Sequence, residues 1–170
     1  MEVFIIAALS LDGYLGRSAD HSSITWRSKE DSEFFMQKTR EAGAVVMGST
    51  TFSTMRRPMP GRKHYVLTSN TQQYSSYDEN LVVGLNFQPK QVVELAKQDG
   101  YSQLAICGGS SVYTQFMQAG LVDKLYLTIE PVLFGQGIKL FNDSIEANLN
   151  LVQTHHLSDQ TIVQELAVVQ

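Results

Sequence analysis

Short apolar runs alternate with helix-like patterns along most of the 170-residue chain, and this alternation restricts the possible folds more than any other feature. The runs contain many β-branched residues and few polar interruptions, which is typical of strands buried on both faces of a sheet. They lie at residues 3–9, 44–47, 64–67, 81–83 and 103–107, and helical patterns lie at 28–41, 89–97 and 111–119, with a short one from residue 50. Because two parallel strands need a crossover connection, usually a helix, this alternation predicts a three-layer α/β fold with a mostly parallel central sheet and helices on both faces.

The C-terminal part of the chain has a different pattern. Strand-like runs at 124–129, 149–156 and 161–169 follow one another without an intervening helical pattern. The last two are joined by Ser158-Asp159-Gln160, which is typical of a hairpin connection, so we expect an antiparallel C-terminal edge. Since no repeat, low-complexity segment or linker divides the chain, residues 1–170 are expected to form a single domain.

The charge balance and the cysteine content exclude several classes of protein. Thirteen basic and seventeen acidic residues give a formal net charge of −4, and no basic block is present to bind nucleic acid or a membrane surface. No apolar run approaches the roughly 18–20 residues that span a bilayer, and Met1–Ala8 lacks the positive start of a signal peptide. A single cysteine, Cys107, excludes an internal disulfide and a cysteine-based zinc site. We therefore expect a cytoplasmic protein that binds neither nucleic acid nor a membrane surface and has no cysteine-based zinc site.

Two glycine-containing turns each join a predicted strand to a predicted helix. Gly108-Gly109-Ser110-Ser111 combines a sharp bend with a free helix start, whose N–H groups and dipole attract anions such as a pyrophosphate. Gly48-Ser49-Thr50-Thr51 has the same position after another strand, although its hydroxyls suit a helix cap equally well. A tight turn without a ligand would explain either segment alone. Because ligands of open α/β sheets bind beyond the carboxyl ends of strands, however, two such turns favour a dinucleotide.

Asp31 lies on the same side of a predicted helix as Phe34 and Phe35. A carboxylate on a core-facing side is costly unless a partner satisfies it, and a protonated heterocycle with paired N–H groups would be such a partner. The alternative is a capping role, since Ser28 and Asp31 have the spacing of a capping box and acids favour the first turn of a helix. Trp26 shortly precedes this helix.

A stiff basic loop runs from Arg57 to Lys63 and contains Pro58, Pro60 and Gly61. An arginine with such a fixed origin can bind a carboxylate through two parallel N–H bonds, although a solvated basic loop is the commoner fate of such a cluster. The histidines show no metal-ligand spacing, and no Gly-x-Ser-x-Gly elbow or Cys–His pairing indicates nucleophilic catalysis.

Taken in order, these segments resemble the dihydrofolate reductase superfamily. The matching segments are Ile6-Ala7-Ala8-Leu9 with Asp12 and Leu15-Gly16, Trp26 with Asp31 and Phe35, Val46-Met47-Gly48 with Thr51, Arg57 to Lys63, Cys107-Gly108-Gly109 with Val112-Tyr113, and Tyr126-Leu127-Thr128. The resemblance implies a dihydrofolate-reductase-like fold and an oxidoreductase that transfers a hydride from NADPH to 7,8-dihydrofolate, with NADH not excluded.

The same resemblance implies roles for individual residues. Asp31, Trp26 and Tyr113 would be catalytic, with Asp31 holding the pterin N3 and 2-amino groups and Trp26 anchoring the loop and an ordered water. The substrate would contact Ala8, Phe35, Met55, Met59, Thr128 and Arg62, the last through its tail carboxylate. The cofactor would contact Ala7, Leu15, Gly16, Gly48, Ser49, Thr50, Thr51, Leu67, Thr68, Ser69, Cys107, Gly108, Gly109, Ser110, Ser111, Val112 and Tyr113.

Some segments depart from the pattern of the folate enzymes. Family members often carry arginines that face the cofactor 2′-phosphate at the positions of Ser49 and Ser111, which weakens the expected preference for NADPH. Glu130 to Phe141 and Ser10 to Gly13 resemble the reductase domain of the riboflavin pathway, whose substrate is a ribosylaminopyrimidine phosphate. The deaminase signature that accompanies that domain is absent.

Three interpretations of the function therefore stay open. The first is a dihydrofolate reductase, the second a riboflavin-pathway pyrimidine reductase, and the third a nucleotide-binding module without catalysis. The substrate is a pterin in the first case and a pyrimidine in the second. Because the riboflavin branch tends to dimerise and the folate enzymes are often monomers, both a monomer and a homodimer are compatible with the sequence.

Overall fold

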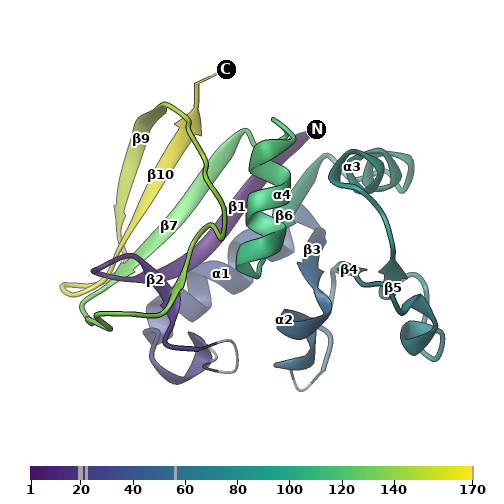
Figure 1. Ribbon diagram of the computed structural model, residues 1–170, viewed down its shortest axis with the longest axis horizontal. Helices are drawn as coiled ribbons and strands as arrows, with labels where there is room; N and C mark the ends of the chain where they lie inside the picture. Colours follow the sequence, from purple (N-terminus) through teal and green to yellow (C-terminus); the bar gives the residue numbers. More distant parts are fainter. Residues whose placement is uncertain (19–20, 22, 56, 170) are drawn as a thin grey trace.

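The computed structural model describes residues 1–18, 21, 23–55 and 57–169, and its centre is an eight-stranded sheet (Figure 1). In spatial order the strands are β5 (Val82–Leu85), β4 (Lys63–Leu67), β3 (Ala44–Gly48), β6 (Gln103–Ile106), β1 (Glu2–Ser10), β7 (Lys124–Glu130), β10 (Ile162–Val168) and β9 (Leu149–His156). Every pairing from β5 to β7 is parallel, whereas β10 runs antiparallel to both β7 and β9. The predicted parallel sheet with an antiparallel C-terminal edge is confirmed.

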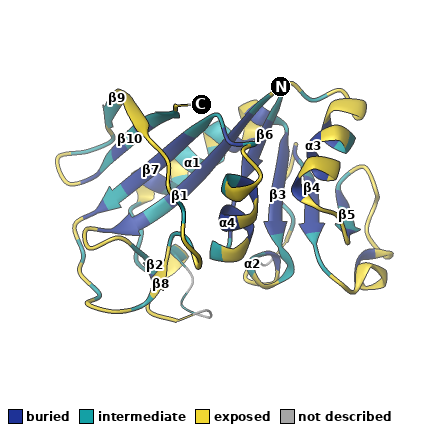
Figure 2. Ribbon diagram, turned by 45° about the horizontal axis from the view of Figure 1, so that its top comes forward, coloured by how far each residue is buried: buried dark blue, intermediate teal, exposed yellow. Residues whose placement is uncertain are grey.

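Four α-helices cover the two faces of this sheet within the described residues. They are α1 (Lys29–Ala42), α2 (Ser49–Ser53), α3 (Pro89–Gln98) and α4 (Ser110–Gln118). The core residues of α1 and α2 belong to one hydrophobic cluster, and those of α3 and α4 belong to the other. Strand β1 contributes to both, because Ile5 faces the second cluster while its neighbours Phe4 and Ile6 face the first, as the alternation of side chains along a strand requires. The three layers are therefore as predicted, with the central strands buried between the helices (Figure 2).

Two short strands form a second sheet that the sequence analysis does not predict. β2 (Tyr14–Gly16) pairs antiparallel with β8 (Ile138–Lys139). Asp12 joins the same two loops, because its carboxylate accepts hydrogen bonds from Phe134 N at 3.2 Å and Gly135 N at 2.7 Å. Two 3₁₀ turns, η1 (Ser23–Thr25) and η2 (Thr71–Tyr74), complete the described elements. No helix in the described part of the chain is long and apolar enough to cross a bilayer.

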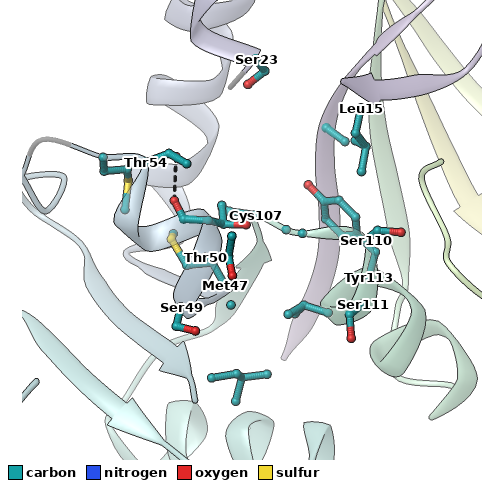
Figure 3. Close-up of a pocket in the computed structure, with 18 of the residues that line it drawn as sticks. Leu15, Ser23, Met47, Ser49, Thr50, Thr54, Cys107, Ser110, Ser111 and Tyr113 are labelled. Carbon is teal, nitrogen blue, oxygen red and sulfur yellow. Dashed lines mark hydrogen bonds between the residues drawn. The ribbon is translucent and has the colours of Figure 1, made fainter. Parts of the chain in front are cut away.

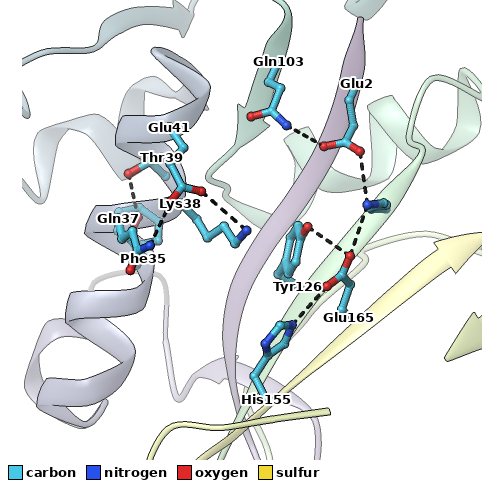
Figure 4. A network of polar contacts seen from close by, with 11 residues as sticks. Glu2, Phe35, Gln37, Lys38, Thr39, Glu41, Gln103, Tyr126, His155 and Glu165 are labelled. Carbon is cyan, nitrogen blue, oxygen red and sulfur yellow. Dashed lines mark hydrogen bonds and ion pairs between the residues drawn. The ribbon is translucent and has the colours of Figure 1, made fainter. Parts of the chain in front are cut away.

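A polar network joins the antiparallel edge to the parallel part of the sheet (Figure 4). The Glu165 carboxylate accepts hydrogen bonds from Tyr126 at 3.2 Å and Lys124 at 3.1 Å, and it contacts His155 Nε2 at 3.0 Å. Lys124 also lies 3.2 Å from Glu2 on β1, so the network crosses four strands. The hydrogen bond that Lys124 donates to Glu165 raises the pKa of Lys124 to about 12.

Glu130, at the end of β7, fixes the start of α1. Glu130 is only 2% exposed, and its Oε1 accepts hydrogen bonds from both Ser28 N and Ser28 Oγ at 2.7 Å. Its Oε2 accepts a third from Thr161 Oγ1 at 3.0 Å, just before β10. A buried carboxylate with three donors is stable because the hydrogen bonds replace lost hydration. Glu130 therefore holds together the start of α1, the end of β7 and the terminal hairpin.

We expect Glu130→Gln to lower the free energy of unfolding by about 1.5–3 kcal/mol, because a charged acceptor is replaced by an amide that brings an unpaired donor into the buried site. Urea unfolding followed by circular dichroism measures this change. The matched control is Glu94→Gln, whose half-exposed carboxylate pairs with Lys97 one helical turn away, and which should alter stability by less than about 0.5 kcal/mol. Equal effects of the two substitutions would contradict this role of Glu130.

Candidate active site

A cavity of about 1100 Å³ opens at the carboxyl ends of the central parallel strands. Figure 3 shows Leu15, Ser110, Ser111 and Tyr113 on one side of it and Met47, Ser49, Thr50 and Thr54 on the other, with Cys107 between the two groups. Every residue that the family resemblance assigns to the cofactor lines this cavity, as do Asp31, Ala8, Phe35, Met55 and Met59. The structure thus brings most of the predicted site residues together, at the place where open α/β sheets bind ligands.

The two glycine turns form one wall of the cavity because a backbone hydrogen bond joins them. Gly48 N donates a hydrogen bond to Gly108 O at 2.8 Å. A Cβ atom at Gly108, whose φ is +106°, would lie 3.1 Å from Tyr113 Oη, and one at Gly109 would lie 3.3 Å from Thr51 Oγ1. The peptide bond between Gly108 and Gly109 is cis. Glycine is therefore needed both for the left-handed conformation and for the close approach of the neighbouring side chains.

The start of α4 has features that favour binding of an anion. Its N-cap residue is Gly109, which offers no side chain to the free N–H groups of the first turn. Within the described residues, Ser110 Oγ is buried and has no hydrogen-bond partner. A buried hydroxyl without a partner, next to a helix N-terminus and a glycine turn, is the donor set that a phosphate group satisfies.

Asp31 is 3% exposed, and the structure separates its two possible roles. Its backbone N–H donates to Ser28 Oγ at 3.1 Å, which is the first half of a helix cap. The second half of a capping box would use the Asp31 side chain, but Glu130 accepts the hydrogen bond from Ser28 N instead. The Asp31 carboxyl therefore remains free of the cap and forms part of the cavity wall.

Burial raises the pKa of the Asp31 carboxyl, and the negative charge of Glu130 adds to this effect. The Thr128 hydroxyl and the Arg27 guanidinium act in the opposite direction. Arg27 Nη1 lies 3.5 Å from Asp31 Oδ2. Thr128 Oγ1 is buried and completes no hydrogen bond of good geometry with any described residue, so its effect on Asp31 is that of a nearby dipole.

Two other titratable groups of the cavity are held neutral. The Tyr113 hydroxyl donates a hydrogen bond to Ile6 O at 2.9 Å, and burial raises its pKa well above the ordinary value. Burial also raises the pKa of the Cys107 thiol to about 12, so this cysteine is not a ready nucleophile. Both side chains line the cavity.

Three predicted site residues lie outside the cavity lining. Trp26 packs edge-to-face on Phe134 with 5.1 Å between the ring centroids, while Thr128 faces Asp31 from β7. Arg62 is buried and donates hydrogen bonds to Pro60 O at 3.0 Å and to Met36 O, which ties its loop to α1. The substrate contacts expected for these residues therefore stay predictions.

Several lining residues are absent from the sequence-based set. They include Arg27, Met36, Thr54, Arg57 and the segment 85–88, which begins with the last residue of β5. The spacing of Arg27 and Asp31, four residues apart at a helix start, is a signal that could have identified their contact. The segment after β5 carries no motif, so only the tertiary structure places it at the cavity. Among the residues that the structure describes, no cluster of three or more possible metal ligands is present.

Comparisons with known proteins agree with this architecture. The dihydrofolate reductase family model matches residues 2–162. Dihydrofolate reductase type 9 of Escherichia coli is 30% identical over 125 residues, which cover 73% of this chain and 67% of that protein.

The solved structures that resemble the whole fold include the following two. One is a protein of Shewanella sp. PV-4 ascribed to riboflavin biosynthesis, with a TM-score of 0.83, 18% identity and full coverage of both chains. The other is dihydrofolate reductase of Enterococcus faecalis complexed with NADP(H), with a TM-score of 0.73, 25% identity and coverage of 99% of this chain and 97% of that chain.

The raised pKa of Asp31 leads to a prediction about stability. Because the folded state binds a proton at Asp31 more tightly than the unfolded state does, ionisation of this carboxyl destabilises the folded protein as pH rises through the folded-state pKa. We expect Asp31→Asn to raise the free energy of unfolding at pH 7, and to leave it unchanged near pH 3, below the unfolded value of about 3.9. Denaturant unfolding across this pH range measures the difference.

The control for this measurement is Asp159→Asn in the exposed turn between β9 and β10, which should show no such pH-dependent gain. A loss of stability in Asp31→Asn at pH 7 would mean that the contact with Arg27 outweighs the cost of burial.

Proposed function

The chain belongs to the dihydrofolate reductase family, and from this premise we propose that it is an oxidoreductase that reduces 7,8-dihydrofolate to tetrahydrofolate with NADPH. The observation that carries the proposal is the Asp31 carboxyl, which is buried, spared from the helix cap and part of the cavity wall. A carboxylate in such a place is stabilised by a flat heterocycle that presents two N–H groups to it.

The residues of the cavity fit a nicotinamide dinucleotide. Ser110 Oγ and the start of α4 would hold its diphosphate, because Ser110 Oγ has no hydrogen-bond partner among the described residues and the Gly109 N-cap offers no side chain to the first turn. Leu67, Thr68 and Ser69 at the end of β4 and Ser49 at the start of α2 extend the same wall. The cofactor, when bound, supplies the hydride for the reduction.

The protein itself would position the substrate and exclude water. Asp31 would accept the paired N–H groups of the pterin and favour its protonated form, while Phe35, Met55 and Met59 would contact the ring and the apolar part of the substrate. The pKa of Asp31 is raised by burial, so its carboxyl holds a proton closer to neutral pH than an exposed acid does. Such a site acts mainly through orientation and through fixed charges near the reacting ring.

Reduction of a ribosylaminopyrimidine phosphate is the second candidate function, and a specific contact favours it. The two segments that resemble the riboflavin branch touch each other in the fold, where Asp12 accepts hydrogen bonds from Phe134 and Gly135. The high TM-score of the Shewanella protein supports this alternative as well. Steady-state oxidation of NADPH with each substrate distinguishes the two functions. Turnover of the pyrimidine alone would make pyrimidine reduction the first candidate and dihydrofolate reduction the second. A chain that binds NADPH and reduces neither substrate would be a nucleotide-binding module.

We expect Asp31→Asn to lower kcat/KM for dihydrofolate roughly 100-fold or more at neutral pH, because general acid–base assistance contributes about 10²–10⁴. The dissociation constant for NADPH should stay within about twofold, since Asp31 would address the substrate and not the cofactor. Steady-state kinetics and a fluorescence titration with NADPH give the two values. Asp159→Asn is the control, and an unchanged kcat/KM in Asp31→Asn would refute the assigned role.

The serines in the cofactor wall predict weak discrimination between NADPH and NADH. Arg27 and Arg57 are the arginines among the described lining residues, while Ser49 and Ser111 occupy the positions where relatives often carry arginine. We expect the dissociation constants of the two cofactors to differ by less than about tenfold. Ser49→Arg should tighten binding of NADPH by about tenfold or more and leave NADH nearly unchanged, because a charge-assisted hydrogen bond contributes about 1.5–3 kcal/mol.

Gln98→Arg, at the exposed end of α3, adds the same charge away from the cavity and serves as the control. If Gln98→Arg improved NADPH binding as much as Ser49→Arg, the effect would come from net charge and the assignment of Ser49 would be wrong.

A further inference from the structure

Arg27 lies directly beside the carboxyl on which the proposed function depends. Its Nη1 lies 3.5 Å from Asp31 Oδ2, and the two side chains are only 15% and 5% exposed. The guanidinium also stacks over the Phe35 ring, with 5.3 Å between Cζ and the ring centroid. All three residues line the cavity, and the contact between Arg27 and Asp31 places a donor group next to an acceptor oxygen.

The contact with Asp31 does not use all the donors of Arg27. Among the residues that the structure describes, Arg27 Nε is buried and has no hydrogen-bond partner. The separation of 3.5 Å from Nη1 to Oδ2 is also longer than the roughly 2.7–2.9 Å of a charge-assisted hydrogen bond. A buried N–H group without an acceptor is costly, and the cost disappears when a ligand supplies the acceptor.

A carboxylate next to a guanidinium matches a particular edge of a heterocycle. The carboxylate accepts a hydrogen bond from a ring N–H, and the guanidinium donates one to a neighbouring oxygen. A ring N–H beside a carbonyl, the lactam edge, presents this donor and acceptor in sequence. In an amidine edge an amino group replaces the carbonyl and presents a donor to Arg27. The N–H groups of the ligand and of Arg27 then face each other, and both can carry positive charge.

We propose that Arg27 determines specificity. It favours the binding of heterocycles that carry a carbonyl beside the N–H bound by Asp31, and it disfavours the binding of their amino analogues. This inference rests on the proposed function, because it takes Asp31 as the group that binds the substrate ring. Pterins and dioxopyrimidines both carry a lactam edge, so the requirement applies to both candidate substrates. The contrasting class is the 2,4-diaminopyrimidine type of ring, which would pair with Asp31 alone.

A purely structural role for Arg27 makes a different prediction. If the guanidinium served only to compensate the charge of Asp31 and to cover Phe35, its removal would weaken all ring ligands to a similar extent. The relative affinity for a carbonyl compound and for its amino analogue therefore separates the two roles, whereas overall activity does not.

The test compares folate with 4-amino-4-deoxyfolate, two ligands that differ only in the group expected to face Arg27. Dissociation constants are measured with saturating NADPH by isothermal titration calorimetry. Arg27→Met removes the donors but keeps an unbranched apolar stem against Phe35. We expect it to weaken folate binding by about ten- to hundredfold, as loss of a charge-assisted hydrogen bond implies. The amino analogue should bind equally well or more tightly, so that the ratio of the two constants shifts by at least tenfold.

Arg57→Met is the matched control, because Arg57 lines the same cavity and forms no ion pair with Asp31 among the described contacts. It should leave the ratio of the two constants within about twofold of the wild-type value. Circular dichroism and urea unfolding verify that both variants are folded. Arg27→Lys retains the charge without the planar fork, and we expect it to restore only part of the preference for folate.

The outcomes separate the inference from the function on which it rests. If wild-type protein binds both ligands and Arg27→Met leaves their ratio unchanged, Arg27 is structural and the inference is wrong while the proposed function stands. If wild-type protein binds NADPH but neither ring compound, the proposed function fails and the inference fails with it. A ratio that shifts in Arg27→Met and not in Arg57→Met supports the specificity role.

Discussion

The hydrogen bonds that Glu130 accepts at the start of α1 are the interaction on which the candidate site depends. By accepting from both Ser28 N and Ser28 Oγ, Glu130 takes the place that an acid in the first turn of the helix ordinarily fills. Asp31 is released from capping and points its carboxyl to the cavity, although its own N–H still completes the cap. A buried acid on β7 thus makes a second buried acid on α1 available for chemistry. The cost of burying Asp31 appears as its raised pKa, and Arg27 reduces that cost only in part.

The strand order provides the other half of the site. Because β3 and β6 are neighbours in the sheet, the turns that follow them meet, and the hydrogen bond from Gly48 N to Gly108 O joins them into one wall. The helices that begin at these turns, α2 and α4, lie on opposite faces of the sheet, so the cavity opens at the edge between them. The resulting surface combines the Ser110 hydroxyl, which has no partner among the described residues, with apolar side chains from α1, and this combination suits a dinucleotide beside a flat ring.

Much of the fold could be predicted because its signals are local. The helix expected at 28–41 is observed at Lys29–Ala42, and the strands at 3–9 and 44–47 are each observed with one or two additional residues. The small sheet of β2 and β8 was missed because a strand of two residues has no periodicity to detect, and its partner lies more than a hundred residues away along the chain. Arg27 was overlooked although its spacing of four residues from Asp31 is a sequence signal, because its second feature, an Nε without a hydrogen-bond partner among the described residues, has no sequence motif.

The sequence alone determined the α/β class, the antiparallel C-terminal edge, the two glycine turns and the family, because periodicity, turn residues and motif order are properties of neighbouring residues. Only the tertiary structure decided that Asp31 is free of the helix cap, that Arg62 is tied to the backbone of α1, and that Arg27 stands beside the carboxyl. These results depend on contacts between α1, β7 and distant loops. The burial and the spare hydrogen-bonding capacity that such contacts leave at each side chain are set by the packing of the whole chain.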